Sequence, residues 1–182
     1  DAAWHKVYLL LELEVEADLP EADATRTLAR ALWEDAALPV ARSLTRAGAA
    51  PAKLHAQGGG DLAWRLAELD RPETLDWLLE SGFELNRLPE SGYPPLFFAT
   101  EGATELLLAR GADPALASAE DGTPVVAFIP APERFRQDEP HFTRAKVNRL
   151  LTAGYPIHHR DRQNKTALER AVGGNRLWLV ER

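Results

Sequence analysis

The side chains in this sequence that could do acid–base or metal chemistry are few and scattered. Of the five histidines only two are adjacent, and neighbouring residues do not both point at one metal ion from a regular helix. Glu12, Glu14 and Glu16 would share one face of a strand, but nothing pairs with these carboxylates or shields them from water. We therefore expect no catalytic residue, no metal site and no cofactor. The histidines are His5, His55, His141, His158 and His159.

Two further kinds of site are also unsupported. The sequence contains no cysteine, which rules out disulfides, thiolate metal sites and cysteine nucleophiles. Gly58, Gly59 and Gly60 precede an expected helix, where a phosphate group could bind. No Lys-Ser or Lys-Thr pair follows them, however, and Asp61 would repel the anion. We interpret this stretch as a turn with a flexible end, and we expect the chain not to be an enzyme.

The residues best suited to recognition lie in the stretch 129–142. Its prolines, Pro130, Pro132 and Pro140, fix φ and prevent regular secondary structure, so we expect a shaped loop. Aromatic and arginine side chains dominate binding hot spots, and loops on a rigid scaffold often carry binding residues. The loop is either a finger that contacts a partner or a cover over the neighbouring helices. Its candidate partner-binding residues are Arg134, Phe135, Arg136, His141 and Phe142.

Charge is distributed unevenly along the chain. The net charge is −7, which argues against nucleic acid as the main partner. Residues 1–140 hold 25 acidic and 12 basic side chains, whereas residues 141–182 hold 3 acidic and 9 basic ones. An acidic end and a basic end would either orient a charged partner on approach or simply be solvated surfaces. No apolar run approaches the length of a transmembrane helix.

The elements that position these residues recur along the sequence. Leucine-rich helix ends stop at Gly48, Gly82, Gly111 and Gly154, which are 34, 29 and 43 residues apart. Each glycine is expected to take the positive φ that the end of a helix requires. One such unit cannot bury its own apolar face, so copies must stack on either side of it.

This pattern resembles the ankyrin repeat, whose usual period is about 33 residues. The resemblance covers roughly residues 24 to 182 and rests best on Thr123-Pro124-Val125 and on the turn at 161–166. It implies an all-α, helix-turn-helix stack (a solenoid). The family's histidine that ties the turns together is replaced by Phe97, Val126 and Glu169, so we expect that network to be absent.

We expect a single domain with a capping segment at each end. The N-terminal cap is 1–23, with residues 4–16 either a helix or a strand. The repeats are 24–60, 61–91, 92–117 and 118–160, with the insertion at 129–142, and the C-terminal cap repeat is 161–182. Helices are expected at 24–34, 39–46, 61–69 with Asp61 as N-cap, 74–80, 96–99, 105–109, 143–152, 166–172 and 176–182; residues 49–60 are expected to be loop. We expect Trp64 and Trp77 in the core; Trp33 and Trp178 could be exposed, although a place in the core or a cap is favoured.

The resemblance also implies a function. Ankyrin modules generally bind other proteins through the tips of their turns and their first helices. Projected onto this chain, the candidate contacts beside the insertion are Arg87, Glu90, Tyr93, Glu120, Asp121, Arg160, Arg162 and Gln163. Fold alone does not decide function, so this step is an analogy.

Two functional hypotheses follow. The first is an inhibitor or immunity protein that neutralises a cognate toxin or enzyme, which the charge polarity and the Arg/Phe loop favour. The second is a regulatory or targeting module of a larger chain, with or without a catalytic domain, which the absence of methionine favours because it indicates processing or trimming before Asp1. The richness in Ala, Leu, Arg and Pro suggests a bacterial source. The compartment would be the periplasm if a signal peptide has been removed and the cytoplasm otherwise, and charged ends favour a monomer.

Overall fold

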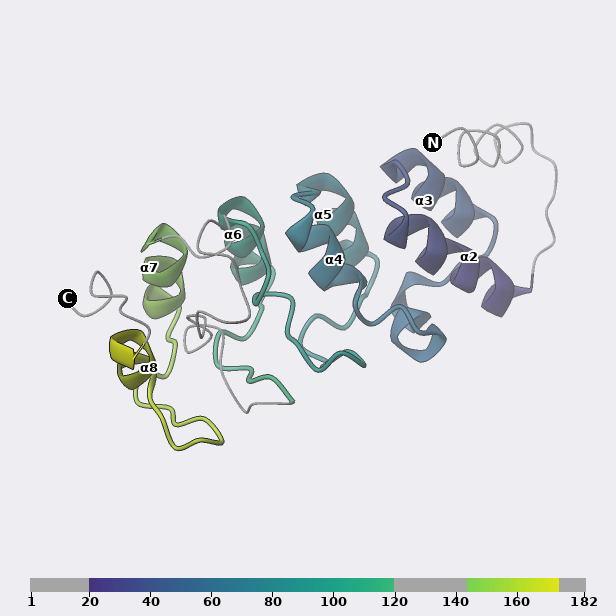
Figure 1. Ribbon diagram of the computed structural model, residues 1–182. Helices are drawn as coiled ribbons and strands as arrows, with labels where there is room; N and C mark the ends of the chain where they lie inside the picture. Colours follow the sequence, from purple (N-terminus) through teal and green to yellow (C-terminus); the bar gives the residue numbers. More distant parts are fainter. Residues whose placement is uncertain (1–19, 120–143, 174–182) are drawn as a thin grey trace.

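A computed structural model describes residues 20–119 and 144–173 of the chain as a row of stacked helices (Figure 1). No β-strand occurs in these two ranges, so the structure confirms the all-α, helix-turn-helix architecture. Loops project from the row between successive units (Figure 1). The elements are α2 (Glu21–Trp33), α3 (Leu38–Arg46), the 3-10 helix η1 (Pro51–Gln57), α4 (Leu62–Glu68), α5 (Pro72–Glu80), α6 (Glu101–Ala109), α7 (Arg144–Thr152) and α8 (Ala167–Gly173).

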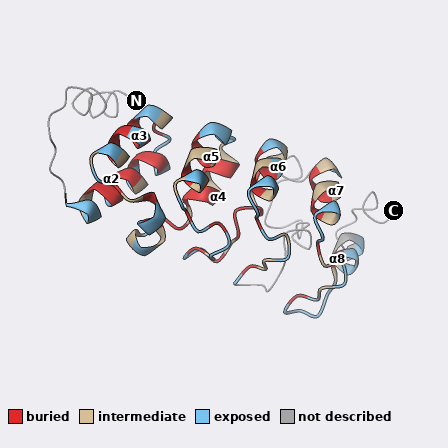
Figure 2. Ribbon diagram, turned by 180° about the vertical axis from the view of Figure 1, so that it is seen from behind, coloured by how far each residue is buried: buried red, intermediate tan, exposed pale blue. Residues whose placement is uncertain are grey.

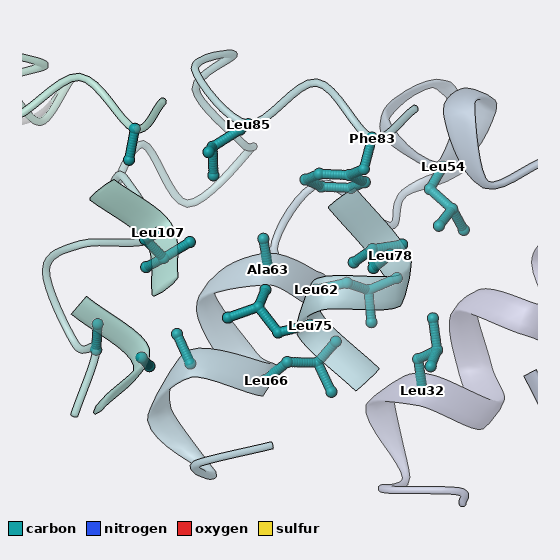
Figure 3. Packing of buried hydrophobic residues seen from close by; sticks show 14 of the residues in the cluster. Leu32, Leu54, Leu62, Ala63, Leu66, Leu75, Leu78, Phe83, Leu85 and Leu107 are labelled. Carbon is teal, nitrogen blue, oxygen red and sulfur yellow. The ribbon is translucent and has the colours of Figure 1, made fainter. Parts of the chain in front are cut away.

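The stack forms because each helix buries one apolar stripe against its neighbours. Leu28 and Leu32 lie on the buried face of α2, and Leu62 and Leu66 lie on that of α4. The buried faces point inward, between the helices, while the outer faces are exposed (Figure 2). The leucines of α4 and α5 meet Leu32 on one side and Leu107 on the other, so one core runs along the row (Figure 3).

Four glycines end the second helices of the units, as the sequence predicts. Gly48, Gly82, Gly111 and Gly154 have φ values of 102°, 88°, 86° and 94°. After three of them the next N–H donates back to a helix carbonyl five residues earlier, as from Ala112 to Leu107 at 2.9 Å. The left-handed glycine thus satisfies carbonyls that the helix end leaves open.

The expectation of a loop at 49–60 is wrong. Pro51–Gln57 forms η1 because Leu54 is fully buried in the core and Gly58, at φ 75°, ends the turn. The glycines that follow are not a flexible end either. A Cβ at Gly59 would lie 3.1 Å from Leu62, and one at Gly60 would lie 3.0 Å from the His55 ring. Close packing therefore explains two of the three glycines.

Two expectations about helix starts also fail. Residues 96–99 do not form a first helix of the pair, since a single turn precedes α6. α6 instead begins four residues earlier than expected, because Thr100 Oγ1 accepts the N–H of Ala103 at 3.2 Å. Asp61 does not cap α4, because its carboxylate accepts a hydrogen bond from Ser91 of the next unit.

A buried lysine contacts residues 96–99, the stretch where the expected helix does not form. Lys146 of α7 is 1% exposed, and its Nζ donates to the carbonyls of Ala99 at 2.7 Å and Phe97 at 3.1 Å. Burial lowers the pKa of Lys146 to about 7, even though the two carbonyls favour its charged form. These two hydrogen bonds therefore connect α7 to the preceding unit of the stack.

Arginines also link successive units on the surface. Arg110 at the end of α6 contacts Asp76 at 2.6 Å and Glu80 at 2.7 Å on α5. Arg149 of α7 in turn pairs with Glu105 and lies 3.7 Å from Glu101 on α6. Each arginine thus bridges two acidic side chains one turn apart on the preceding helix.

Several predictions fall on residues outside the described ranges. They are the form of residues 4–16, the entry at Thr123-Pro124, the insertion 129–142, residues 1–19 of the N-terminal cap, and residues 174–182 of the cap repeat 161–182, with the helix at 176–182 and Trp178. The exact repeat boundaries also stay a prediction.

Candidate partner-binding surfaces

A row of aromatic side chains crosses three successive units of the stack. The rings of Trp33 and Trp64 are parallel within 10°, with centroids 6.4 Å apart. Phe98 meets Trp64 edge-on at 5.1 Å, and Tyr93 meets Phe98 at 5.7 Å. We call Trp33, Trp64, Phe98 and Tyr93 the aromatic row. Trp33 is 48% exposed and the other three are partly exposed, so part of this apolar surface faces solvent.

Arg65 packs against the aromatic row. The Arg65 guanidinium lies 5.7 Å from the centre of the Trp33 ring, within the range of a cation–π interaction, and contacts Glu68 at 2.9 Å. Arg65 Nε and Trp64 Nε1 are buried donors with no acceptor in the part of the chain that the structure describes. Buried donors are usually satisfied, so these two atoms are exceptions that lie at the row.

The sequence predicted only one member of the row, Tyr93. Trp64 and Trp77 are half-buried, not core residues, and Trp33 is exposed, not covered. A signal was present in the spacing, because Trp33, Trp64 and Phe98 are 31 and 34 residues apart, close to the repeat period. Aromatic residues at one-repeat spacing lie side by side on a stack.

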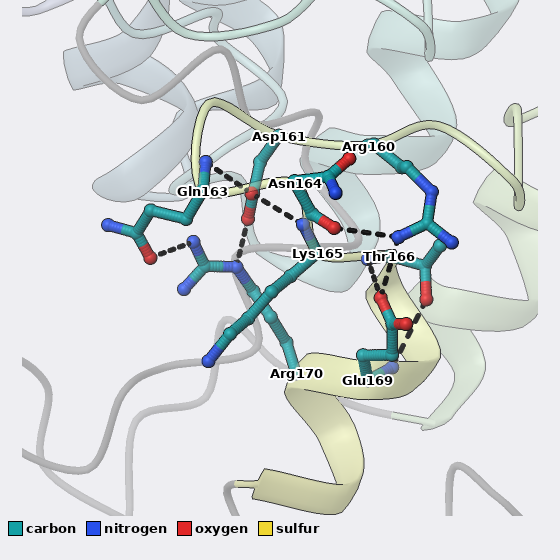
Figure 4. A network of polar contacts seen from close by, with 8 residues as sticks. All are labelled: Arg160, Asp161, Gln163, Asn164, Lys165, Thr166, Glu169 and Arg170. Carbon is teal, nitrogen blue, oxygen red and sulfur yellow. Dashed lines mark hydrogen bonds and ion pairs between the residues drawn. The ribbon is translucent and has the colours of Figure 1, made fainter.

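A second surface is the loop of residues 155–166, which joins α7 to α8 (Figure 4). Its centre is the buried carboxylate of Asp161, which accepts the N–H groups of Gln163 at 2.8 Å and Lys165 at 3.0 Å and also binds Arg170 of α8. Burial alone would raise the pKa of Asp161, but these hydrogen bonds outweigh it and hold that pKa below its ordinary value.

The same loop is tied to the start of α8. Glu169 accepts the N–H of Thr166 at 2.7 Å, and Thr166 Oγ1 accepts the N–H of Glu169 at 3.2 Å, which is a capping box. Arg160 donates to Glu169 at 3.2 Å and to the carbonyl of Asn164 at 2.6 Å. The Thr166 N–H and the Arg160 guanidinium together lower the pKa of Glu169.

Other side chains connect the loops of neighbouring units in place of the family's turn histidine. The Asn86 amide donates to the carbonyl of Gly111 and accepts the N–H of Asp113, both at 2.9 Å. His55 of η1 lies 3.0 Å from the carbonyl of Glu84 and stacks on Phe83 at 4.5 Å. These contacts fix the spacing of the loops along the stack.

The predicted contact residues fall into separate places. Arg160 and Gln163 belong to one network in the loop 155–166, and Arg162 is exposed beside them. Arg87 pairs with Glu84 at 3.1 Å, and Glu90 is exposed. Those outside the described residues are Glu120, Asp121, Arg134, Phe135, Arg136, His141 and Phe142.

Other kinds of site find no support in residues 20–119 and 144–173. No group of three or more His, Asp or Glu side chains in these ranges is arranged to hold a metal ion. None of the helices described there is both long and apolar enough to cross a membrane.

The architecture defines a class: a repeat protein made of stacked helix pairs with projecting loops. Residues 63–105, from α4 into α6, match the family of ankyrin repeats (many copies). Over this stretch the chain is similar to ankyrin repeats, as the sequence pattern indicated. No curated protein matches the chain. Ankyrin repeats generally mediate protein–protein interactions and are typically not catalytic, so the chain's repeats imply a protein partner.

Proposed function

We propose that this chain is a non-enzymatic binding protein for one cognate protein, which it inhibits or to which it gives immunity. The observation that carries the proposal is the aromatic row, with Trp33 48% exposed and Arg65 against its ring. Tryptophan, tyrosine and arginine are the residues most often found at binding hot spots. Trp33 stacks on Trp64 and contacts Arg65 but still leaves about half of its surface exposed, where a partner can pack against it.

The polar atoms at the row support the same proposal. Trp64 Nε1 and Arg65 Nε are both donors and lack an acceptor among the residues described. Leaving a buried donor unsatisfied costs about 1–3 kcal/mol. Both atoms have almost no exposed surface, so a carbonyl or carboxylate oxygen of a partner would remove part of that cost only if the two side chains shifted on binding. The insertion 129–142, with Phe135 and Arg136, stays a predicted second contact.

Affinity capture from an extract of the source organism tests the proposal. The intact chain is compared with Trp33→Ala, with Phe135→Ala/Arg136→Ala, and with the control Arg42→Ala, which changes an exposed residue of α3. The recovered partner is then assayed for its own activity with and without an equimolar amount of the chain.

We expect one stoichiometric protein, retained by Arg42→Ala and weakened roughly 30-fold or more by Trp33→Ala, the loss typical of a hot-spot residue. We also expect its activity to fall when the chain is added. Capture of no stoichiometric protein would refute the proposal. A partner whose activity is unchanged would refute inhibition and favour a regulatory or targeting module.

A further inference from the structure

The loop 155–166 differs from the rest of the stack in the sign of its charge. Residues 20–119 carry nine basic and 15 acidic side chains, whereas residues 144–173 carry seven basic and two acidic ones. The two acidic residues are Asp161 and Glu169. Within this region basic side chains outnumber acidic ones, and the position of the two carboxylates decides only how far they offset the basic charge locally.

Both carboxylates have basic partners: Asp161 is buried in the loop, and Glu169, at the start of α8, is half exposed and paired with Arg160. The Asp161 side chain is fully buried and is surrounded by the N–H groups of Gln163 and Lys165 and by Arg170. Glu169 faces the Thr166 N–H and Arg160. Lys165, Arg162 and His158 are exposed, and Lys165 forms no ion pair with any residue described. Asp161 thus points inward, while Arg162, Lys165 and His158 are exposed and the exposed Glu169 at the start of α8 is paired with Arg160.

The outward arrangement is fixed before any partner arrives. Asn164 takes a left-handed φ of 59° in the turn, and its N–H donates to the carbonyl of Asp161 at 2.8 Å. The N–H of Asp161 donates to the carbonyl of Lys165 at 3.0 Å, and Gln163 accepts from Arg170 at 2.8 Å (Figure 4). A surface that is already ordered loses less conformational entropy when it binds.

The loop also offers an apolar contact. Ile157 is 56% exposed and stands next to His158. An exposed aliphatic side chain in the same loop as Arg162 and Lys165 matches a segment that combines carboxylates with an apolar residue.

From these observations we propose that the loop 155–166 is the docking point for an acidic segment of the partner protein, held by Arg162, Lys165 and Ile157. The inference rests on the proposed binding function and adds the chemistry of the partner. An acidic protein segment fits better than nucleic acid. Arg162 and Lys165 lie in one short loop, while residues 20–119 have a net charge of −6 and would repel a phosphate backbone that continues past the loop.

Fluorescence anisotropy with the full chain tests the proposal. The probes are a short fluorescein-labelled peptide rich in Glu and Leu, the same peptide with every Glu replaced by Gln, and a single-stranded oligothymidylate of similar length. The variant Arg162→Glu/Lys165→Glu reverses two exposed charges of the loop. The control Arg26→Glu/Arg42→Glu makes the same change of net charge on α2 and α3, where both arginines are exposed.

We expect the Glu peptide to bind, and the loop variant to bind it at least about tenfold more weakly while the control changes by less than about threefold. Binding should also weaken severalfold as sodium chloride is raised from about 50 mM to about 300 mM. Equal loss in the loop variant and the control, or equal binding of the Glu and Gln peptides, would overturn the proposal. Preferential binding of the oligothymidylate would also overturn it and would assign the loop to phosphate.

The variant Asp161→Ala distinguishes a loop that is ordered for binding from a loop that binds through its net positive charge alone. Net charge alone predicts tighter binding of the acidic peptide, because the substitution removes a negative charge. We expect binding at least about threefold weaker, because the loop loses the contacts that order it. Tighter binding would contradict the proposal. Capture of a partner that is sensitive to Trp33→Ala but not to Arg162→Glu/Lys165→Glu would defeat this inference alone and leave the proposed function intact.

Discussion

In the helices from α2 to α5 the side chains that meet between elements are mostly leucine and alanine, whereas around α7 and α8 several are charged. The first region buries Leu28, Leu32, Leu62, Leu66, Leu75 and Leu78 almost completely. The second region also buries Lys146 and Asp161, and leaves Leu168 and Val172 of α8 more than half exposed. The stack is thus held mainly by apolar burial at one end and to a larger extent by polar contacts at the other.

This difference has a functional meaning. Apolar packing is non-directional and gives a stiff scaffold, but it cannot set the direction of individual charged groups. Hydrogen bonds around a buried carboxylate can do so, because each bond fixes the position of one donor. The end of the stack that presents a basic loop is therefore the end where polar contacts shape the backbone.

We expect the largest difference between the two regions in the stability lost when a buried leucine of α4 is shortened to alanine. Leu66→Ala should destabilise the protein by about 2–5 kcal/mol, since Leu66 is 1% exposed and its removal leaves a cavity. Leu168→Ala on α8 is the matched control, and at 54% exposure it should cost less than about 0.5 kcal/mol. Urea unfolding of both variants checks the pair. Equal losses would show that the two ends are packed alike.

The second prediction concerns the carboxylate that orders the basic loop. Asp161→Ala leaves the N–H groups of Gln163 and Lys165 and the Arg170 side chain without their acceptor. This should lower the local stability of the loop by about 1–3 kcal/mol. Cleavage by trypsin after Arg160, Arg162 and Lys165 should therefore be faster by about tenfold, while urea unfolding of α2–α5 changes little. Unchanged cleavage would mean that Asp161 does not order the loop.

The third prediction uses the pH dependence of Lys146. Its pKa is about 7 in the folded protein and 10.5 in the unfolded chain, so between these values the unfolded chain binds more protons. The contribution of Lys146 to stability should therefore rise as pH increases from about 7 to 10. Subtracting the stability of Lys146→Met at each pH isolates this contribution, because other groups titrate equally in both proteins. A difference that stays flat would contradict a buried, easily deprotonated lysine.

The smallest effect is expected on the surface. Arg110→Ala removes ion pairs with Asp76 and Glu80, which are partly exposed, and should cost less than about 1 kcal/mol. Added salt should shrink the difference between this variant and the original chain. A loss comparable to that of Leu66→Ala would mean that the ion pairs, and not the leucines, hold the units together.

The sequence predicted those parts of the fold that depend on local rules. The positive φ of Gly48, Gly82, Gly111 and Gly154 follows from the helix that each one ends, and their spacing was enough to predict a stack. η1 could not be predicted in this way. Its formation depends on Leu54 packing into a core that other units build.

The candidate surfaces show the same limit. Arg160, Arg162 and Gln163 were predicted because turn tips are contact sites in this family, but the role of Asp161 as the centre of the loop depends on Arg170, nine residues away. Trp33 and Trp64 were missed because a tryptophan in a helix is usually core, and only the neighbouring unit decides whether its ring is covered. The role of Lys146 depends on carbonyls 47 and 49 residues earlier in the chain.

Hydrogen exchange in the free protein tests most directly the central claim, that polar contacts preform the basic loop on an apolar scaffold. The amides to follow are those of Gln163 and Lys165, which donate to Asp161. We expect both to exchange more slowly by about tenfold or more than in Asp161→Ala, while amides in α4 and α5 exchange alike in the two proteins. Equally fast exchange of Gln163 and Lys165 in the original chain and the variant would show that the loop is not preformed and would contradict the account.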